Sequence, residues 1–229
     1  MKSIDQVVDF SFSFRFLPFV SKLEAGFVRY SEVSKYIHFV ITSFLSIEPG
    51  QVRPEILQLM SLVAKAHPRS VLEIGTASGG TLFLLAQCAG VDARIISIDL
   101  PGGLFGSGYP TWKIPIFKSF CRETQSMLLI RGDSHDKEVV KAVKSHLDIG
   151  LDFLLIDGDH RYSKVKQDFE LYSPLVEHGM IAFHDVAALS PDSGCEGHKF
   201  WDEIKNSYKH VEIVENWNQG WGGFGIIVL

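Results

Sequence analysis

Cysteine is scarce in this sequence, and so is any excess of positive charge. The three cysteines, Cys88, Cys121 and Cys195, form no C-x-x-C pair, so we expect no disulfide framework and a cytoplasmic location. The formal net charge of −5 gives the whole chain no long-range attraction to nucleic acid or to an anionic membrane. No apolar run is long enough to span a bilayer, and the N-terminus lacks the layout of a secretion signal. We therefore expect neither nucleic acid nor membrane as a partner.

The chain length fits one α/β domain with an extension. Of its 229 residues, 46% are hydrophobic and 21% are charged, as in an ordinary globular protein. Residues 1–50 are rich in phenylalanine and lack an alternating strand pattern. We interpret them as an N-terminal helical extension that caps a site or forms a contact in a homo-oligomer. Glu48-Pro49-Gly50 then breaks the chain, and the main domain is expected over residues 51–229.

From residue 54 onward, apolar runs typical of strands alternate with segments of helical spacing. Strands are expected over 70–75, 94–99, 127–133, 151–157 and 179–185, and helices over 54–66, 81–89, 115–126, 137–146, 164–176 and 198–207. This alternation predicts a parallel sheet covered on both faces by helices. The last two apolar runs, 210–216 and 223–229, have no helix between them and predict an antiparallel hairpin at the sheet edge. In such a sheet a ligand binds beyond the carboxyl ends of the strands.

Carboxylates occur at or near the ends of the expected core strands, apart from one within the first strand. They are Glu73, Asp99, Asp133, Asp157 and Asp185. A single aspartate in such a place is an ordinary turn or helix-cap residue. Five at one edge of a sheet need cations or hydrogen-bond donors to offset their charge, so this edge is the expected functional site.

A glycine-rich loop follows the first strand. Glycine lets the backbone approach a ligand closely, and the helix after the loop presents free N–H groups. The loop departs from the dinucleotide pattern G-x-G-x-x-G because Ala77 replaces its second glycine. Asp99 lies about 25 residues downstream of the loop and is placed to bind the two hydroxyls of a ribose. The segment Val71 to Gly80 is thus predicted to hold a nucleoside cofactor.

The series VLEIGTASGG, IISIDLPGG and RGDSHD resembles the cofactor-binding motifs of class I S-adenosylmethionine-dependent methyltransferases. The resemblance covers residues from about 55 to 229, closing hairpin included. It implies a Rossmann-like, seven-stranded, mostly parallel sheet and a catalytic domain over 51–229. It also implies a loop that cradles the methionine part of the cofactor, supported by Glu73, with Asp99 at the ribose and Asp133 and Ser134 near the adenine. Leu100 is expected to bind the cofactor as well. The loop consists of Gly75, Thr76, Ala77, Ser78 and Gly79.

The segment LLIDGDHRYSKVKQDFELYSPLVEHGMIAFHD is similar to a narrower branch, the metal-dependent O-methyltransferases typified by macrolide-sugar methyltransferases and the cephalosporin-hydroxylase-like group. This similarity implies that Asp157 and the pair His184-Asp185 hold a divalent metal, expected to be Mg²⁺, and that His160 is the catalytic base. Asp157 is expected to contribute to catalysis and to the cofactor site as well. His184 stands where relatives often carry a carboxylate, which puts the third ligand in doubt.

Together these residues predict metal-assisted O-methylation, and the resemblance implies a hydroxyl on a small molecule or sugar as the acceptor. Methyl transfer requires alignment of the nucleophile with the S–CH3 bond. A metal on Asp157 and Asp185 would lower the pKa of the hydroxyl, and a neutral His160 could accept its proton near pH 7. The alternatives are an NAD-dependent oxidoreductase, favoured by the glycine loop and Asp99, and a non-catalytic protein that keeps the fold.

Several of these residues have plainer interpretations. Asp159 is typical of a helix cap, His160 could hydrogen-bond Asp157, and His184 could be a packing residue. The loop 101–115 is either a mobile lid that carries Tyr109 and Trp112 or an ordinary connection, and residues 187–197 form the other expected substrate-facing loop. Surface or structural roles are expected for three histidines and packing roles for three tryptophans; these are His135, His178 and His198, and Trp201, Trp217 and Trp221.

Overall fold

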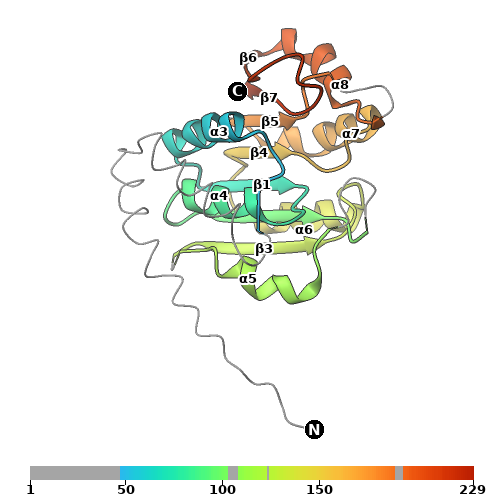
Figure 1. The fold of residues 1–229 in the computed structure, drawn as a ribbon. Coiled ribbons are helices and arrows are strands. Elements are labelled where there is room, and N and C mark those ends of the chain that lie inside the picture. Colours follow the sequence, from blue (N-terminus) through green and yellow to red (C-terminus); the bar gives the residue numbers. More distant parts are fainter. Residues whose placement is uncertain (1–46, 103–107, 123, 189–192) are drawn as a thin grey trace.

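The computed structural model describes residues 47–102, 108–122, 124–188 and 193–229 (Figure 1). Most of the predicted N-terminal extension, residues 1–46, lies outside this part of the chain. The described residues form a seven-stranded sheet with the order β3-β2-β1-β4-β5-β7-β6. The strands are β1 (Ser70–Ile74), β2 (Arg94–Asp99), β3 (Ser126–Arg131), β4 (Phe153–Ile156), β5 (Met180–His184), β6 (Lys209–Ile213) and β7 (Phe224–Val228).

Helices alternate with the strands as the sequence predicted. They are α3 (Arg53–Ala66), α4 (Gly80–Cys88), α5 (Ile114–Lys118), α6 (Lys137–His146), α7 (Tyr162–Tyr172) and α8 (Gly197–Ile204), with short 3₁₀ turns η1 (Thr111–Lys113), η2 (Ser173–Leu175) and η4 (Lys205–Ser207). Strands β1 to β5 pair in parallel, whereas β7 runs antiparallel to both β5 and β6. The predicted closing hairpin is therefore confirmed. No helix in the described ranges has the length and apolar character needed to cross a membrane.

The sheet separates two apolar cores. Because successive side chains of a strand point to opposite faces, Val71 and Ile95 join one core with α3, α4 and α5. Their neighbours Leu72 and Ile96 join the other core with α6, α7 and α8. The strands are apolar on both faces for this reason, as expected of a covered parallel sheet.

One predicted helix is much shorter than expected. The helix predicted over 115–126 ends at Lys118, and the chain continues without helix to β3. Side-chain hydrogen bonds hold this segment to the end of α4: Gln125 donates to the carbonyl oxygens of Ala86 and Gly90, at 2.9 Å each. Gln87 donates to the carbonyl of Phe120 at 2.9 Å. These long-range contacts replace the backbone hydrogen bonds that the helical spacing suggested.

The loops after the parallel strands are joined at one edge of the sheet. The Gly75 N–H donates to the Ile98 carbonyl at 2.9 Å, and the Asp157 N–H donates to the Ile74 carbonyl at 2.9 Å. Gly75 has a φ of +97°, and a Cβ at this position would lie 2.0 Å from the carbonyl oxygen of Asp157. Only glycine therefore allows the loops after β1 and β4 to approach each other in this way.

Candidate active site

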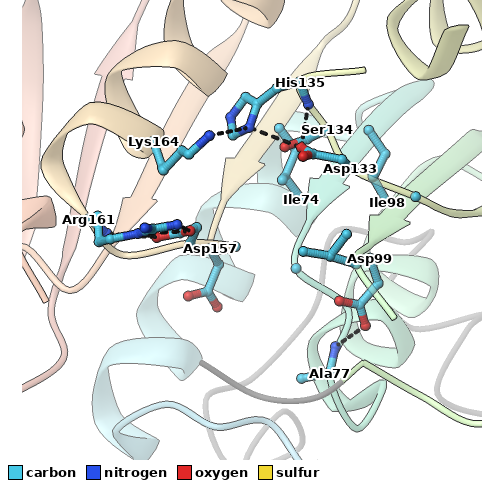
Figure 2. Close-up of a pocket in the computed structure, with 15 residues that line it drawn as sticks. Ile74, Ala77, Ile98, Asp99, Asp133, Ser134, His135, Asp157, Arg161 and Lys164 are labelled. Carbon is cyan, nitrogen blue, oxygen red and sulfur yellow. Dashed lines mark hydrogen bonds and ion pairs between the residues drawn. The ribbon is translucent and has the colours of Figure 1, made fainter. Parts of the chain in front are cut away.

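A pocket at the carboxyl ends of β1 to β4 collects most of the predicted cofactor residues (Figure 2). Figure 2 shows Asp99 and Ala77 on one side, Asp133 and Ser134 on another, and Asp157 between them and the residues of α7. Gly75 and Leu100 also line this pocket, which we call the nucleoside pocket. The structure thus brings together the residues expected at the ribose and the adenine.

Asp99 is the best-defined group of the nucleoside pocket. The backbone N–H of Ala77 donates to its Oδ2 at 3.0 Å, which links the glycine loop to the end of β2. Burial raises the pKa of Asp99 to about 6, against the lowering effects of the Ala77 and Leu100 amides and of Arg131. A partly desolvated carboxylate of this kind gains from a ligand that brings hydroxyl donors.

Glu73 supports the loop from behind and lines neither pocket described here. Its side chain is fully buried, and Ser97 Oγ donates to its Oε2 at 2.9 Å. The Thr76 hydroxyl hydrogen-bonds Ser97 in turn. Burial raises the pKa of Glu73 well above its usual value, although the hydrogen bond from Ser97 lowers it. Glu73 therefore acts on the loop through Ser97 and Thr76.

His135 lies in the nucleoside pocket, in a network that the sequence did not indicate. Its Nδ1 lies 3.0 Å from Asp133 Oδ1, and its Nε2 lies 3.0 Å from Oδ1 of the buried Asp168 on α7. Ser134 Oγ donates to Asp168 at 2.6 Å, and the Tyr172 hydroxyl donates to the Ser134 carbonyl at 2.6 Å. Burial would lower the pKa of His135, but Asp168 raises it overall. The spacing of Asp168 and Tyr172, four residues apart on one helix face, was the available signal.

A second pocket, of about 230 Å³, adjoins the first and shares Gly75, Ala77 and Asp157 with it. We call it the acceptor-side pocket. Its other lining residues come from five separate segments, and they include Gln51, Thr81, His160, His184, Asp185 and Trp221. Asp157 therefore stands where the two pockets meet, with the predicted base His160 on the far side.

Two carboxylates and two imidazoles form a compact network in the acceptor-side pocket. His184 Nδ1 lies 2.9 Å from Asp157 Oδ1 and 3.6 Å from Asp185 Oδ1, and His160 Nδ1 lies 3.1 Å from Asp185 Oδ2. Two further donors face these carboxylates: Gln51 Nε2 donates to Asp157 Oδ2 at 2.7 Å, and the Gly222 N–H donates to Asp185 Oδ1 at 2.8 Å. His160 thus pairs with Asp185, whereas the plainer interpretation had paired it with Asp157.

The charges in this network compensate one another. Burial would lower the pKa of His184, but the Asp157 carboxylate raises it to about 9. Burial raises the pKa of Asp157, yet the charge of His184 outweighs this effect and lowers it. The two residues therefore form a buried ion pair near neutral pH. Asp185 also holds a left-handed backbone, with φ +56°, a conformation that costs about 1–3 kcal/mol outside glycine and is often found at functional sites.

The predicted metal ligands Asp157, Asp185 and His184 do lie together, but they face one another. In the described ranges, no group of three or more histidine, cysteine, aspartate or glutamate side chains is arranged to hold a metal ion. The donor types suit a divalent metal. Their present arrangement is instead that of hydrogen-bonded and ion-paired partners, so the prediction of a metal site is not confirmed.

The structure agrees with some of the remaining sequence-based assignments and contradicts others. Asp159 accepts from the Arg161 N–H at 3.1 Å, in a turn before α7, and Trp201 is a fully buried core residue as expected. Trp217 and Trp221 are 51% and 44% exposed, so the packing role predicted for them is wrong. Tyr109 is buried against Phe117, with ring centroids 4.8 Å apart.

The burial of Tyr109 indicates that the described ends of the loop 101–115 form an ordinary connection and not a mobile lid. Residues 103–107 lie outside the described residues, as do 189–192 of the predicted substrate-facing loop 187–197. His178 is exposed, as a surface residue should be, and His198 is partly buried.

Comparison with known proteins identifies the family. A family model described as a methyltransferase domain matches residues 72–186, which is half of the chain and contains both pockets' strand-end loops. The chain belongs to this methyltransferase family. An uncharacterized protein of Acanthamoeba polyphaga mimivirus is 32% identical over 131 residues, which are 57% of each protein. The chain thus matches little more than half the length of this curated relative.

Solved structures confirm the class I methyltransferase fold. An O-methyltransferase from Bacillus cereus in complex with SAH has a TM-score of 0.58 at 17% identity, over 91% of this chain and 96% of that one. An O-methyltransferase from Streptomyces achromogenes involved in tomaymycin synthesis, in complex with SAM, has a TM-score of 0.57 at 15% identity, over 94% and 97%. At these identities the likeness shows the fold, and the predicted fold is therefore confirmed.

Proposed function

We propose that this methyltransferase uses S-adenosylmethionine to methylate a hydroxyl group of a small molecule or sugar. The observation that carries the proposal is the junction of the two pockets at Gly75 and Asp157. A nucleoside on Asp99 would extend its reactive end toward this junction, next to the His160–Asp185 pair. The two similar O-methyltransferase structures, in complex with SAH and with SAM, support the same cofactor and reaction.

The chain fits the cofactor at three places. Asp99 offers a partly desolvated carboxylate to the ribose hydroxyls, and the backbone at Gly75 is free of the Cβ that would block close approach. Asp133 and Ser134 line the part of the nucleoside pocket expected at the adenine. When bound, S-adenosylmethionine supplies a sulfonium methyl group, which needs only a correctly aligned nucleophile.

His160 is the proposed general base. With its Nδ1 proton directed to Asp185 Oδ2 at 3.1 Å, the basic nitrogen of the neutral imidazole is Nε2. Asp185 orients the ring and stabilises the imidazolium that forms when His160 takes the proton of the acceptor hydroxyl. The His184–Asp157 ion pair holds the floor of the pocket and keeps the buried Asp157 charge compensated.

A divalent metal such as Mg²⁺ is the other part of the sequence-based hypothesis. On Asp157, Asp185 and His184 it would lower the pKa of the hydroxyl. The described side chains do not fit it as they stand, because each carboxylate oxygen already faces a donor at 2.7–3.1 Å. We therefore assign the proton transfer to His160 and Asp185 alone.

Two measurements test the proposal. Calorimetry should detect binding of S-adenosylhomocysteine but not of NADH, and isotope-labelled S-adenosylmethionine should transfer its methyl group to a hydroxyl acceptor. Turnover that survives EDTA supports the metal-free assignment, and turnover that is lost and then restored by Mg²⁺ overturns it. The variant His160→Ala should lower kcat about 100-fold or more while S-adenosylhomocysteine binding stays unchanged. His178→Ala, at an exposed position, is the matched control and should behave as the wild type.

A further inference from the structure

The loop between β6 and β7 contributes an aromatic wall to the acceptor-side pocket. Trp221 lines this pocket together with His160, His184 and Asp185, and its side chain is 44% exposed. We infer that Trp221 is the stacking surface for the acceptor, and that the acceptor is an uncharged ring with an apolar face that carries the hydroxyl group. This inference rests on the proposed function and names the substrate class of the same site.

The loop is fixed from beneath by a buried carboxylate far away in the sequence. Glu55 of α3 is fully buried, and it accepts from the Glu215 N–H at 2.9 Å, from Gln219 Nε2 at 2.7 Å and from the Gly223 N–H at 2.8 Å. Three donors on one buried carboxylate constrain the backbone and side-chain groups that bind it. Glu55 is therefore a positioning residue for the segment that carries Trp221.

The same loop is also tied to the catalytic network. The Gly222 N–H, one residue after Trp221, donates to Asp185 Oδ1 at 2.8 Å, and the Ala187 N–H donates to the Gly222 carbonyl at 2.9 Å. Gly222 adopts a φ of +79°, which lets the backbone turn toward Asp185 directly after the indole. The position of Trp221 is thus set relative to Asp185, the partner of the proposed base.

The lining of the pocket decides the kind of ring. Of the described residues that line it, Glu48, Asp157 and Asp185 are acidic and none is a lysine or an arginine. The cationic His184 is already paired with Asp157, so a carboxylate or phosphate on the acceptor would meet mainly like charge. An indole face binds flat apolar surfaces by stacking. The cavity of about 230 Å³ exceeds the roughly 150 Å³ that accommodates benzene. A phenol and the apolar face of an uncharged sugar share this chemistry.

Steady-state kinetics on Trp221 variants test the inference. The acceptors are a simple phenol, an uncharged sugar with an apolar face, and a benzoate that carries the same phenolic hydroxyl. Trp221→Ala should raise KM for the preferred ring about tenfold, as expected for a lost stacking contact, while Trp221→Phe should recover most of it. The benzoate should be the poorest acceptor of the wild type. Glu55→Gln should raise the acceptor KM more than it lowers kcat and should leave S-adenosylhomocysteine affinity unchanged.

Trp217 provides the matched control, because it lies on the same loop and is 51% exposed but does not line the pocket. Trp217→Ala should leave KM unchanged. Equal KM values for Trp221→Ala and Trp217→Ala would overturn the inference, as would a wild type that prefers the benzoate. Acceptor binding to the complex with S-adenosylhomocysteine, followed by ligand-observed NMR, separates this inference from the proposed function. Binding that depends on Trp221 without turnover would refute only the O-methylation, and absence of binding by either uncharged ring would refute the ring assignment.

Discussion

Gly75→Ala is the most direct test of how the cofactor loop is built. The substitution adds one methyl group at a residue whose φ is +97°. The new Cβ would lie 2.0 Å from the carbonyl oxygen of Asp157 and 2.9 Å from the Cα of Gly158. Both atoms belong to the backbone after β4, so no side-chain rotation can relieve the overlap. Either the loop after β1 or the backbone at Asp157 must move.

The cost has two parts. A left-handed backbone at alanine costs roughly 1–2 kcal/mol, and overpacking against a rigid neighbour typically costs a further 1–3 kcal/mol. To reach even 3.0 Å from the Asp157 oxygen, the shortest separation that real Cβ atoms tolerate, the backbone must shift by about 1 Å. A displacement of that size in a binding site can cost about 100-fold in function. We therefore expect a destabilisation of about 2–5 kcal/mol and at least a tenfold loss of S-adenosylhomocysteine affinity.

Gly102→Ala separates these two parts. Gly102 has a similar φ of +83°, but a Cβ there meets no atom of the described residues within 4 Å. Thermal unfolding should therefore give a Tm decrease of about 2–8 °C for Gly102→Ala and about 4–20 °C for Gly75→Ala, and calorimetry should find weakened cofactor binding only for the second. If both variants lost the same stability and kept the same affinity as the wild type, the close approach of the two loops would not matter, and our account of the pocket junction would be refuted.

Two further predictions concern the nucleoside pocket. Burial raises the pKa of Asp99 to about 6, and ribose hydroxyls favour its charged form. S-adenosylhomocysteine should therefore bind about tenfold more tightly at pH 7 than at pH 5. The raised pKa also means that the contribution of Asp99 to the stability of the free enzyme is lost as pH rises from about 4 to 6. Calorimetry across this range would show no such trend for Asp99→Asn, and a wild type with flat affinity would contradict the assignment. Asp168→Asn should weaken S-adenosylhomocysteine binding about tenfold, because Asp168 accepts from Ser134 and pairs with His135. Asp202→Asn, on α8 and outside both pockets, is the control and should bind as the wild type does; equal affinities for the two variants would show that the α7 contact is dispensable.

The sequence indicated which strand-end residues gather in the nucleoside pocket, because that side of the site is local. Each strand-end residue, such as Asp99 or Asp157, directly follows an apolar run, and parallel strands bring those ends to one edge. The same rule could not reveal His135, whose role depends on Asp168 from a helix packed across the sheet edge. It also could not reveal that the helix predicted over 115–126 would end at Lys118, since side-chain hydrogen bonds from Gln125 and Gln87 determine that segment.

On the acceptor side the sequence indicated His160, His184 and Asp185, but the arrangement around them was hidden for a stronger physical reason. Its geometry depends on pairs far apart in the chain: Gln51 and Asp157 are separated by 106 residues, and Glu55 and Gly223 by 168. Neither Gln51 nor Glu55 belongs to a motif, and both lie at the boundary between the main domain and the segment before it. The two sides of the site are therefore built from different parts of the chain. The residues of the nucleoside pocket follow parallel strands, whereas Glu55 and Asp185 bind the backbone directly after Trp221. We therefore expect substitutions on the acceptor side to alter the proposed ring recognition without disturbing the proposed methyl-donor site.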